Sequence, residues 1–485
     1  MELVFKNKKI IDFFICIILF FLCYLAFFKN LGLYSLRTWD ESRNAVTVLE
    51  MVKSNNWLIP TYLDVPDLWN TKPPILIWLQ AINFKLFGVS EFNLRLPSAV
   101  SATLTVFIVY FFGAYGLKRK GIGLLSSLML VSAMGFSDIH AARTGDYDSL
   151  LVLFTTCASI VTFLWLENQN KKYIWLASLL WAIAVLTKSS AGILFWPGLG
   201  LYLIFSKKVI LLWKKKRDLV GPILMWFVLV FGFYFLENKI NPGYLAAVWK
   251  NDLWGRYSEM GSDRAYSFQY YWDFMKNFRF QYWIYFWPIS ILGLLFPFDK
   301  KIKKWLSFSW CLVTVYFLII SMSETKQLWY DLPIYPLVVL AASSMVIGIV
   351  EILPWWLKLI PLLPVIFYLQ RGVRTNLAYI ARPDIDKNTN DCQKYGYLFS
   401  EVNKDWGGID GVHGEYFCTP ANFYFKLNGI TRKEFGEIQS GDKVLSCHRP
   451  TLSDFRDKFV VVEENLPLEC KIVTIGKLKQ NNNGI

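Results

Sequence analysis

Apolar runs alternate with polar links over the first 370 residues of the chain. Each run holds about 15 to 20 residues, the length that a helix needs to cross the hydrocarbon core of a bilayer. The pattern predicts roughly eleven membrane spans. They are residues 11–28, 94–117, 122–136, 150–166, 173–186, 191–205, 219–236, 280–298, 305–321, 333–350 and 355–368. Between the first two spans, residues 74–87 are expected to form a short amphipathic or juxtamembrane helix.

The composition supports this interpretation. Hydrophobic residues make up 54% of the 485 residues and charged residues only 18%, whereas soluble domains carry about 25% charged residues. The mean hydropathy is +0.34. The sequence contains no phosphate-binding glycine loop and no Ser-His-Asp pattern, which argues against a nucleotide-driven machine. We therefore expect a polytopic α-helical membrane protein with about 11 to 13 transmembrane helices.

The basic residues indicate the orientation of the spans. The net charge is +14, and Lys and Arg cluster at 118–120, 171–172, 207–217 and 300–304, as well as before an uncleaved first span. With the N-terminus in the cytoplasm, every one of these clusters falls on the cytoplasmic side, as the positive-inside rule requires. The loop 29–93, the shorter polar loops and the tail then lie outside, so we expect the polar chemistry on the extracytoplasmic face.

The tail, residues 371–485, is polar and long enough for a core of its own. We expect a small α/β domain, with strands in 413–417, 442–447, 457–465 and 470–478 and helices with threonine caps in 419–427 and 451–459. The tail holds four cysteines without a C-x-x-C spacing: Cys392, Cys418, Cys447 and Cys470. Up to two disulfides and buried free thiols are both compatible with this pattern.

Two groups in the first large loop are candidates for chemistry. Asp40 and Glu41, with Arg43, follow the first span directly, and a carboxylate near an apolar boundary can act as a general base. The alternative is that Asp40 caps a helix. Lys72 precedes Pro73 and Pro74 at the expected start of a helix, where it needs a negative partner, either Asp67 or a phosphate.

Two later loops carry further candidates. Arg143, Asp146 and Asp148 lie in a short loop between two spans, where each charge is costly and an ion pair that fixes the loop is the alternative role. Lys326 and Tyr330 are four residues apart and would share a helix face, although Lys326 could equally be an interfacial anchor. His140 lies near the first of these loops and is expected to pack locally, while His413 and His448 in the tail lack metal-ligand spacing.

Four stretches together resemble one known family. They are DESRNAVTVLEMVKSNNWLIPTYLDVPDLWNTKPPILIWL at 40–79, ARTGDYDSLL at 142–151, AVLTKSSAG at 184–192 and TKQLWYDLPIYP at 325–336. In this order they resemble the GT-C membrane glycosyltransferases, and among these the bacterial protein O-mannosyltransferase and lipid A aminoarabinose transferase family. The likeness covers roughly the first 340 residues. Thr71 stands where that family often has Glu, and Ser189-Ser190 stands where Gly-Pro is common.

The resemblance implies a GT-C domain over residues 1–370, whose loop 29–93 carries the catalytic motif, followed by the extracytoplasmic domain 371–485. It implies an inverting transfer of a sugar from a polyprenyl-phosphate donor to a lipid A, glycan or protein acceptor, at the outer face of a bacterial cytoplasmic membrane. Asp40 and Asp148 would be the catalytic residues. The residues implied to bind substrate are Glu41, Arg43, Lys72, Arg143, Asp146, Lys326 and Tyr330.

No metal or other cofactor is expected, although a divalent cation is compatible with the pattern. Nucleic acid is not an expected partner, whereas membrane lipids are. A lipid or sugar transporter is the alternative function, but such a protein should show internal repeats and ionisable groups at span centres. The sequence names neither the sugar nor the acceptor, and it leaves the role of the tail and the oligomeric state open.

Overall fold

The computed structural model describes residues 2–254, 267–380, 391–413 and 418–479, with side chains from residue 10 onward and those of 253 and 254 left out. The chain forms two compact units. The first, here called the helical unit, comprises Met1–Lys29, Asp67–Leu76 and Leu96–Ile380. The second, here called the loop–tail unit, comprises Asn30–Pro66, Ile77–Arg95 and Ala381–Ile485. The predicted first loop therefore clusters with the tail in two separate pieces.

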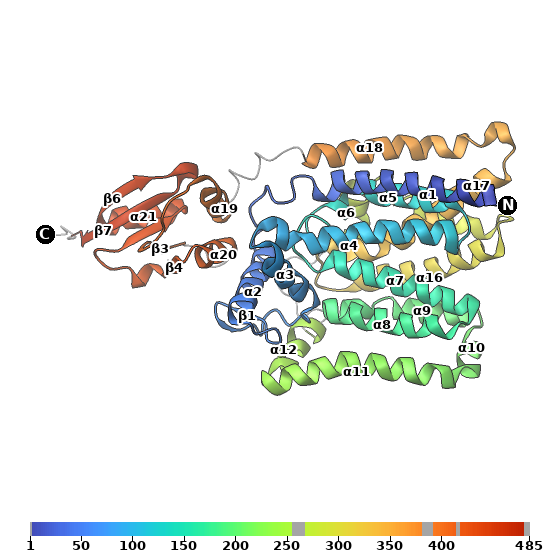
Figure 1. The fold of residues 1–485 in the computed structure, drawn as a ribbon, viewed down its shortest axis with the longest axis horizontal. Helices are drawn as coiled ribbons and strands as arrows, with labels where there is room; N and C mark the ends of the chain where they lie inside the picture. The colour runs from blue at the N-terminus through green and yellow to red at the C-terminus, as the bar shows by residue number, and fades with distance from the viewer. Residues whose placement is uncertain (1, 255–266, 381–390, 414–417, 480–485) are drawn as a thin grey trace. The chain divides into compact units, whose positions relative to one another are not determined.

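The helical unit is a bundle of long apolar helices (Figure 1). Within the described residues, seven helical segments are long and apolar enough to cross a membrane, and three shorter apolar helices accompany them. The main helices are α1 (Glu2–Cys23), α4 (Glu91–Phe111), α5 (Lys120–Ser132), α7 (Asp148–Asn168), α8 (Lys171–Lys188), α9 (Trp196–Phe205), α11 (Lys216–Ile240), α16 (Lys300–Met322), α17 (Tyr335–Ile352) and α18 (Leu363–Ile380). The number of membrane crossings stays a prediction.

Short helices connect the long ones. They are α6 (Met134–Ser137), α10 (Val209–Lys214), α12 (Tyr244–Val248), α14 (Tyr270–Phe274) and α15 (Phe286–Ser290), with a π-helical segment η4 (Trp249–Trp254) and a 3-10 segment η7 (Leu328–Ile334). Two of these connections, η4 and η7, carry Asp252 and Tyr330 of the site described below.

Prolines explain where the predicted spans differ from the structure. The span predicted at 280–298 is wrong as a single helix, because α15 ends at Ser290 and a 3-10 turn follows. Pro288 and Pro297 each lack the N–H that a continuous helix would use. The span predicted at 355–368 is displaced, since the proline-rich stretch before Leu363 delays the start of α18. Residue 370, the boundary chosen from the sequence, lies inside α18.

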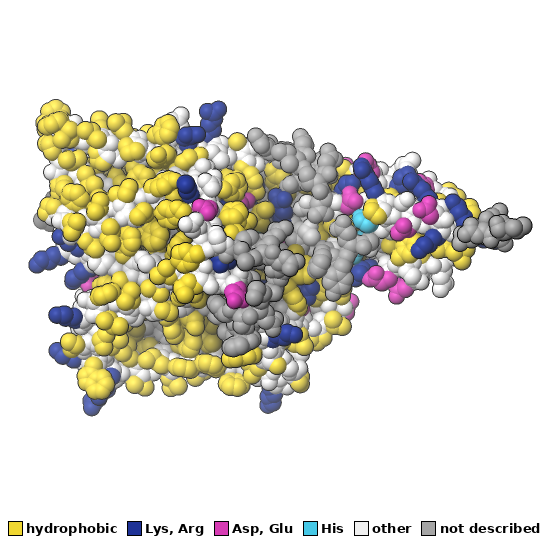
Figure 2. All heavy atoms as spheres, turned by 180° about the vertical axis from the view of Figure 1, so that it is seen from behind, with side chains coloured by type: hydrophobic (Ala, Val, Ile, Leu, Met, Phe, Trp, Pro, Cys, Tyr) yellow, Lys and Arg dark blue, Asp and Glu magenta, His cyan; other side chains and the backbone are white. Residues whose placement is uncertain are grey.

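Apolar side chains cover the outside of the helical unit. Figure 2 shows hydrophobic residues over the face turned to the viewer, with Lys and Arg along its left edge. On α11, Phe227, Phe231 and Phe235 are all exposed. A soluble protein rarely exposes such a continuous apolar surface, whereas lipid covers it at no cost. The protein is therefore a multi-pass membrane protein.

The loop–tail unit begins with α2 (Asp40–Ser54), the short hairpin β1 (Thr61–Tyr62) and β2 (Val65–Pro66), and α3 (Ile75–Phe87). The tail adds α19 (Asp391–Glu401), α20 (Thr419–Leu427) and α21 (Arg449–Lys458). Its five-stranded sheet has the order β4-β3-β5-β7-β6. The strands are β3 (Asp410–Gly411), β4 (Thr431–Arg432), β5 (Lys443–Ser446), β6 (Phe459–Asn465) and β7 (Lys471–Leu478).

The tail is the small α/β domain that the sequence predicts, with corrections in detail. Three of the predicted strands correspond to β5, β6 and β7, while the predicted strand at 413–417 lies, apart from His413, outside the described residues. The predicted threonine caps are wrong. Cys418 occupies the N-cap position of α20, and the His448 side chain caps α21 by accepting a hydrogen bond from the Thr451 N–H.

All four cysteines of the tail are paired. Disulfides join Cys392 to Cys418 and Cys447 to Cys470. Of the two possibilities left open by the sequence, the structure shows the disulfides. The pattern fits an exported domain, since disulfides persist in oxidising compartments.

Candidate functional site

A pocket with charged and apolar walls lies within the helical unit and is partly open to solvent. Four charged residues line the pocket: Lys72, Asp148, Lys188 and Asp252. Apolar side chains such as Leu151, Leu194 and Ile320 form much of the remaining wall. The pocket therefore places charged groups beside an apolar surface.

A tight turn presents Lys72 at the pocket. The Asp67 carboxylate accepts hydrogen bonds from the N–H groups of Trp69 and Asn70 at 3.0 and 3.1 Å, which closes the turn. The Asn70 side chain in turn accepts a hydrogen bond of 3.0 Å from Lys72 Nζ, and Nζ also lies 5.3 Å from the centre of the Tyr147 ring. The sequence suggests Asp67 or a phosphate as the negative partner of Lys72. In the structure, Asp67 shapes the backbone of the turn that carries Lys72.

Lys188 and Asp148, which also line the pocket, form a buried ion pair. Lys188 Nζ lies 2.5 Å from Asp148 Oδ1, and the two side chains are 8% and 3% exposed. His140 Nδ1 lies 3.7 Å from the same carboxylate, while the His140 ring stacks on Trp329 with the ring centres 3.4 Å apart. These contacts fix the orientation of the Asp148 carboxylate at the start of α7.

Asp252 is a pocket residue that the sequence analysis missed. It belongs to η4, and its Oδ2 atom accepts hydrogen bonds from the hydroxyls of Thr71 and Ser189 at 3.0 and 2.9 Å. Nothing in the spacing of Asp252 in the sequence marks it. The available signal is indirect: Thr71 and Ser189 are two of the three positions at which the sequence departs from the pattern it resembles, and both bond to this carboxylate.

Contacts with two neighbouring residues hold the segment that carries Tyr330. Tyr330 lies 5.6 Å from Lys188 Nζ, measured to the ring centre, and its carbonyl accepts a hydrogen bond of 3.0 Å from the Tyr316 hydroxyl. The next residue, Asp331, is fully buried and pairs with Arg279 at 3.4 Å. Because a buried charge is stable only when paired, this ion pair anchors η7 and with it Tyr330.

Lys326 is placed differently from the prediction. It precedes η7, so it does not share a helix face with Tyr330. Its Nζ atom donates a hydrogen bond of 2.5 Å to the Ser323 carbonyl, just beyond the end of α16. Burial lowers the pKa of the Lys326 ammonium. Ser323 lines the pocket, so Lys326 lies next to it.

Arg143 and Asp146 are buried in the loop before α7. Arg143 donates a hydrogen bond of 3.3 Å to the carbonyl of Ala26, and Asp146 lies 3.5 Å from His140 Nδ1. The Asp146 carbonyl also accepts a hydrogen bond from Ser98. These contacts tie the loop to two other segments of the helical unit and so support the position of Asp148.

The remaining predicted residues belong to the loop–tail unit. Asp40 is the first residue of α2, where its charge suits the positive end of the helix dipole, while Trp39 occupies the cap position. The Arg43 guanidinium lies over the Tyr62 ring, 3.9 Å from its centre. Both side chains are partly accessible.

Glu41 has a structural role. Its two carboxylate oxygens accept hydrogen bonds of 2.6 and 2.9 Å from Arg95, and a third comes from the Arg37 N–H at 2.7 Å. Both side chains of the Glu41–Arg95 ion pair are at most 2% exposed. A carboxylate that is buried and paired in this way is directed into the protein core.

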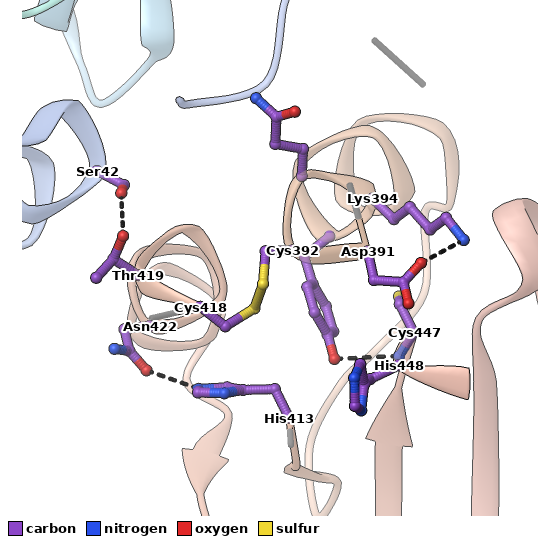
Figure 3. Close-up of a disulfide and its surroundings, with 12 residues drawn as sticks. Ser42, Asp391, Cys392, Lys394, His413, Cys418, Thr419, Asn422, Cys447 and His448 are labelled. Atoms are coloured by element: carbon purple, nitrogen blue, oxygen red, sulfur yellow. Dashed lines mark hydrogen bonds and ion pairs between the residues drawn. A yellow bond between two sulfur atoms is a disulfide. The ribbon is translucent and has the colours of Figure 1, made fainter. Parts of the chain in front are cut away.

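The tail holds the helix that carries Asp40 and Arg43. Figure 3 shows Ser42 of α2 facing Thr419 of α20, next to the Cys392–Cys418 disulfide. The two hydroxyl oxygens lie 2.6 Å apart, and the Thr419 hydroxyl also accepts a hydrogen bond of 2.8 Å from the Trp39 N–H. Asn422 donates a hydrogen bond to the hydroxyl of Tyr62, the ring under Arg43. The tail thus contributes to the order of the first loop.

Among the described residues, no group of three or more His, Cys, Asp or Glu side chains is arranged to hold a metal ion. The two pocket carboxylates, Asp148 and Asp252, are engaged by Lys188 and by two hydroxyls. The pocket therefore combines cations with oriented carboxylates, a composition suited to binding a phosphate and a polar group beside it.

Comparison with known proteins gives consistent results. Residues 71–234 match the model of the dolichyl-phosphate-mannose-protein mannosyltransferase family. An uncharacterized protein of Aquifex aeolicus is 28% identical over 64% of this chain and 59% of its own length. The undecaprenyl phosphate-α-4-amino-4-deoxy-L-arabinose arabinosyl transferase of Shewanella sediminis is 32% identical over 33% of this chain and 29% of its own length. The aligned region thus spans less than two thirds of either relative.

Solved structures share the fold over almost the whole chain. The structure of ArnT from Cupriavidus metallidurans bound to undecaprenyl phosphate has a TM-score of 0.71 at 15% identity, over 94% of this chain and 97% of that one. The oligosaccharyltransferase of Archaeoglobus fulgidus has a TM-score of 0.51 at 12% identity, over 98% and 75%. The resemblance noted in the sequence is confirmed: the chain has the GT-C fold and is similar to membrane glycosyltransferases over part of its sequence.

Proposed function

We propose that this chain transfers a sugar from a polyprenyl-phosphate donor to an acceptor in the cell envelope. The carrying observation is the pocket, which places the cations Lys72 and Lys188 and the carboxylates Asp148 and Asp252 against an apolar wall. A donor with a phosphate between a sugar and a hydrocarbon tail has the matching chemistry. A relative with the same fold was solved with undecaprenyl phosphate bound, which supports the same class of donor here.

The reaction is a single displacement at the anomeric carbon. The acceptor oxygen bonds to the anomeric carbon as the bond from that carbon to the phosphate oxygen breaks. Polyprenyl phosphate leaves, and the configuration at the anomeric carbon of the transferred sugar is inverted. Lys72 and Tyr330 stabilise the charge that develops on the leaving phosphate, and the resemblance alone assigns Arg43 to the same task. Arg43 offers a planar fork of donors, whereas Lys72 acts as a point charge.

The carboxylates act on the other side of the reaction. Asp40 takes the proton of an acceptor hydroxyl or orients that hydroxyl. Asp148, fixed by Lys188 and His140, supports the sugar or the acceptor. If the acceptor is a phosphate of lipid A, it is already an anion, and Asp40 then acts by positioning alone. Lipid A, a glycan and a protein are the acceptor classes of this proposal.

We place the enzyme in the bacterial cytoplasmic membrane with its site and tail on the outer face. The two disulfides of the tail support an exported domain, and the basic clusters support a cytoplasmic N-terminus. Alkaline phosphatase fused after Ile380 should be active. An inactive fusion at this point, with an active cytoplasmic reporter there, would reverse the orientation.

Mass analysis of envelope components tests the function itself. A strain that lacks this chain should lose one sugar residue from lipid A, a surface polysaccharide or a set of envelope proteins. The purified chain in detergent should restore that mass when supplied with the corresponding polyprenyl-phosphate sugar. Movement of the donor across vesicles without a new glycosidic bond would instead identify a transporter.

A further inference from the structure

One carboxylate oxygen connects the two segments that carry the pocket lysines. Oδ2 of Asp252 accepts hydrogen bonds from Thr71 Oγ1 at 3.0 Å and from Ser189 Oγ at 2.9 Å. Thr71 directly precedes Lys72, and Ser189 directly follows Lys188. The two lysines come from distant parts of the sequence, and the residue next to each of them is held by the same atom.

Tyrosines fix both residues in turn, one through a side-chain hydroxyl and one through a backbone carbonyl. The Tyr234 hydroxyl donates a hydrogen bond of 3.2 Å to Ser189 Oγ, so the single proton of Ser189 is left for Asp252. The Tyr244 hydroxyl donates a hydrogen bond of 2.9 Å to the Thr71 carbonyl. Thr71, Ser189 and Asp252 are each at most 4% exposed. A connected buried network of this kind holds its members in one arrangement.

The backbone at Ser189 supports the same conclusion. Its φ and ψ angles are 44° and −131°, a conformation that favours glycine and is strained for a residue with a Cβ atom. A glycine here would remove the strain but also the hydroxyl that reaches Asp252. Strain persists at a position only when its surroundings impose it, and here the contact with Asp252 is part of what does so.

We propose that Asp252 is a positioning residue, which sets the separation between Lys72, the residue that holds the donor phosphate, and the Lys188–Asp148 pair. This inference rests on the proposed function, because it concerns the same pocket. Asp252 acts through hydrogen bonds to Thr71 and Ser189. The reaction does not require the negative charge of Asp252 to act on the substrate.

Four variants separate these roles: Asp252→Ala, Asp252→Asn, Thr71→Val and Ser189→Ala. Each is measured for sugar transfer and, separately, for binding of polyprenyl phosphate alone. Asp252→Ala should lower kcat/KM by about 100-fold, the size expected when reacting groups are misplaced by about 1 Å. Asp252→Asn should stay within about tenfold of wild type, since the amide oxygen still accepts from both hydroxyls.

The decisive part of the test is whether the effects of the Thr71 and Asp252 substitutions on lipid-phosphate binding are coupled. Thr71→Val should weaken lipid-phosphate binding in the wild type but add little in the Asp252→Ala background, because the hydroxyl has then lost its acceptor. Thr105→Val is the matched control. It removes a buried hydroxyl that bonds to the Ser101 carbonyl within α4, and neither residue lines the pocket, so transfer should be unchanged.

Two results would overturn the inference. Equal losses in Asp252→Asn and Asp252→Ala would show that the charge matters, and fully additive losses in the double variant would show that Thr71 acts independently. If thermal melting shows that Asp252→Ala does not fold, the single variants Thr71→Val and Ser189→Ala are compared with their double variant. This comparison then decides the question. Wild-type chain that binds the lipid phosphate but transfers no sugar would contradict the proposed function instead, while the binding data still rank the variants.

Discussion

Lys188 at the end of α8 and Asp148 at the start of α7 pair inside the pocket, with Lys188 Nζ 2.5 Å from Asp148 Oδ1. Removal of one partner from a buried pair leaves an uncompensated charge, which typically costs about 3 to 5 kcal/mol. We therefore expect Lys188→Met and Asp148→Leu each to lower the melting temperature and abolish transfer.

The double variant Lys188→Met/Asp148→Leu distinguishes stability from chemistry. It should recover much of the lost stability, because no charge is left unpaired, but it should stay inactive. Thermal melting and the transfer assay on the same preparations check both points. Recovered activity in the double variant would show that this pair only holds the helices together.

Asp40 and its neighbour Glu41 should behave in opposite ways. Asp40→Asn should fold normally, because the charge at the first position of α2 contributes only about 0.3 to 1 kcal/mol. Its turnover should fall by about 100- to 10,000-fold if Asp40 is the general base. Glu41→Gln should instead lose stability, since Arg95 stays buried without its counter-charge. Near-normal turnover of folded Asp40→Asn would remove it from the mechanism.

The disulfides give a prediction that needs no substrate. In membranes from the native compartment, Cys392, Cys418, Cys447 and Cys470 should resist alkylation under denaturing conditions until a reductant is added. Cys16, Cys23, Cys157 and Cys311 should label without reductant and serve as the internal control. Labelling of all eight without reductant would contradict the pairing.

The tail should lose stability at low pH through Glu463. Hydrogen bonds from Arg456, followed by Lys471, lower the pKa of the Glu463 carboxyl to about 2. The pKa of a Glu in an unfolded chain is about 4.3. The stabilisation is therefore complete above that pH and is lost as the pH falls toward 2. Glu463→Gln should flatten the dependence of the melting temperature on pH between these values, and an unchanged profile would contradict the assignment.

Much of this architecture could be predicted from local sequence. The helix at 419–427 and the strands β5, β6 and β7 follow from hydrophobic periodicity, and Lys72 and Asp148 were identified as candidates because charges are costly beside apolar spans. Periodicity failed where prolines interrupt apolar runs, as between 280 and 298, because such a run looks continuous by composition alone.

The contacts that define the site are long-range and could not be predicted in the same way. In the sequence, Asp252 is an ordinary acidic residue of a polar loop. Only the folded chain brings Thr71 and Ser189 to it. Glu41 looked like a ligand because its partner Arg95 lies more than fifty residues away in the sequence. In both cases the role depends on which buried group lies opposite, and a single sequence does not show that.

Lys72 tests the central claim most directly, since the pocket is proposed to hold the donor through its phosphate. The measurement is sugar transfer from a polyprenyl-phosphate sugar by wild type, Lys72→Ala and the exposed control Lys85→Ala, whose Nζ bonds to Asn55. We expect transfer by wild type and Lys85→Ala, and a loss of about 100- to 1,000-fold in Lys72→Ala with weaker lipid-phosphate binding. Wild-type rates in folded Lys72→Ala would contradict the account.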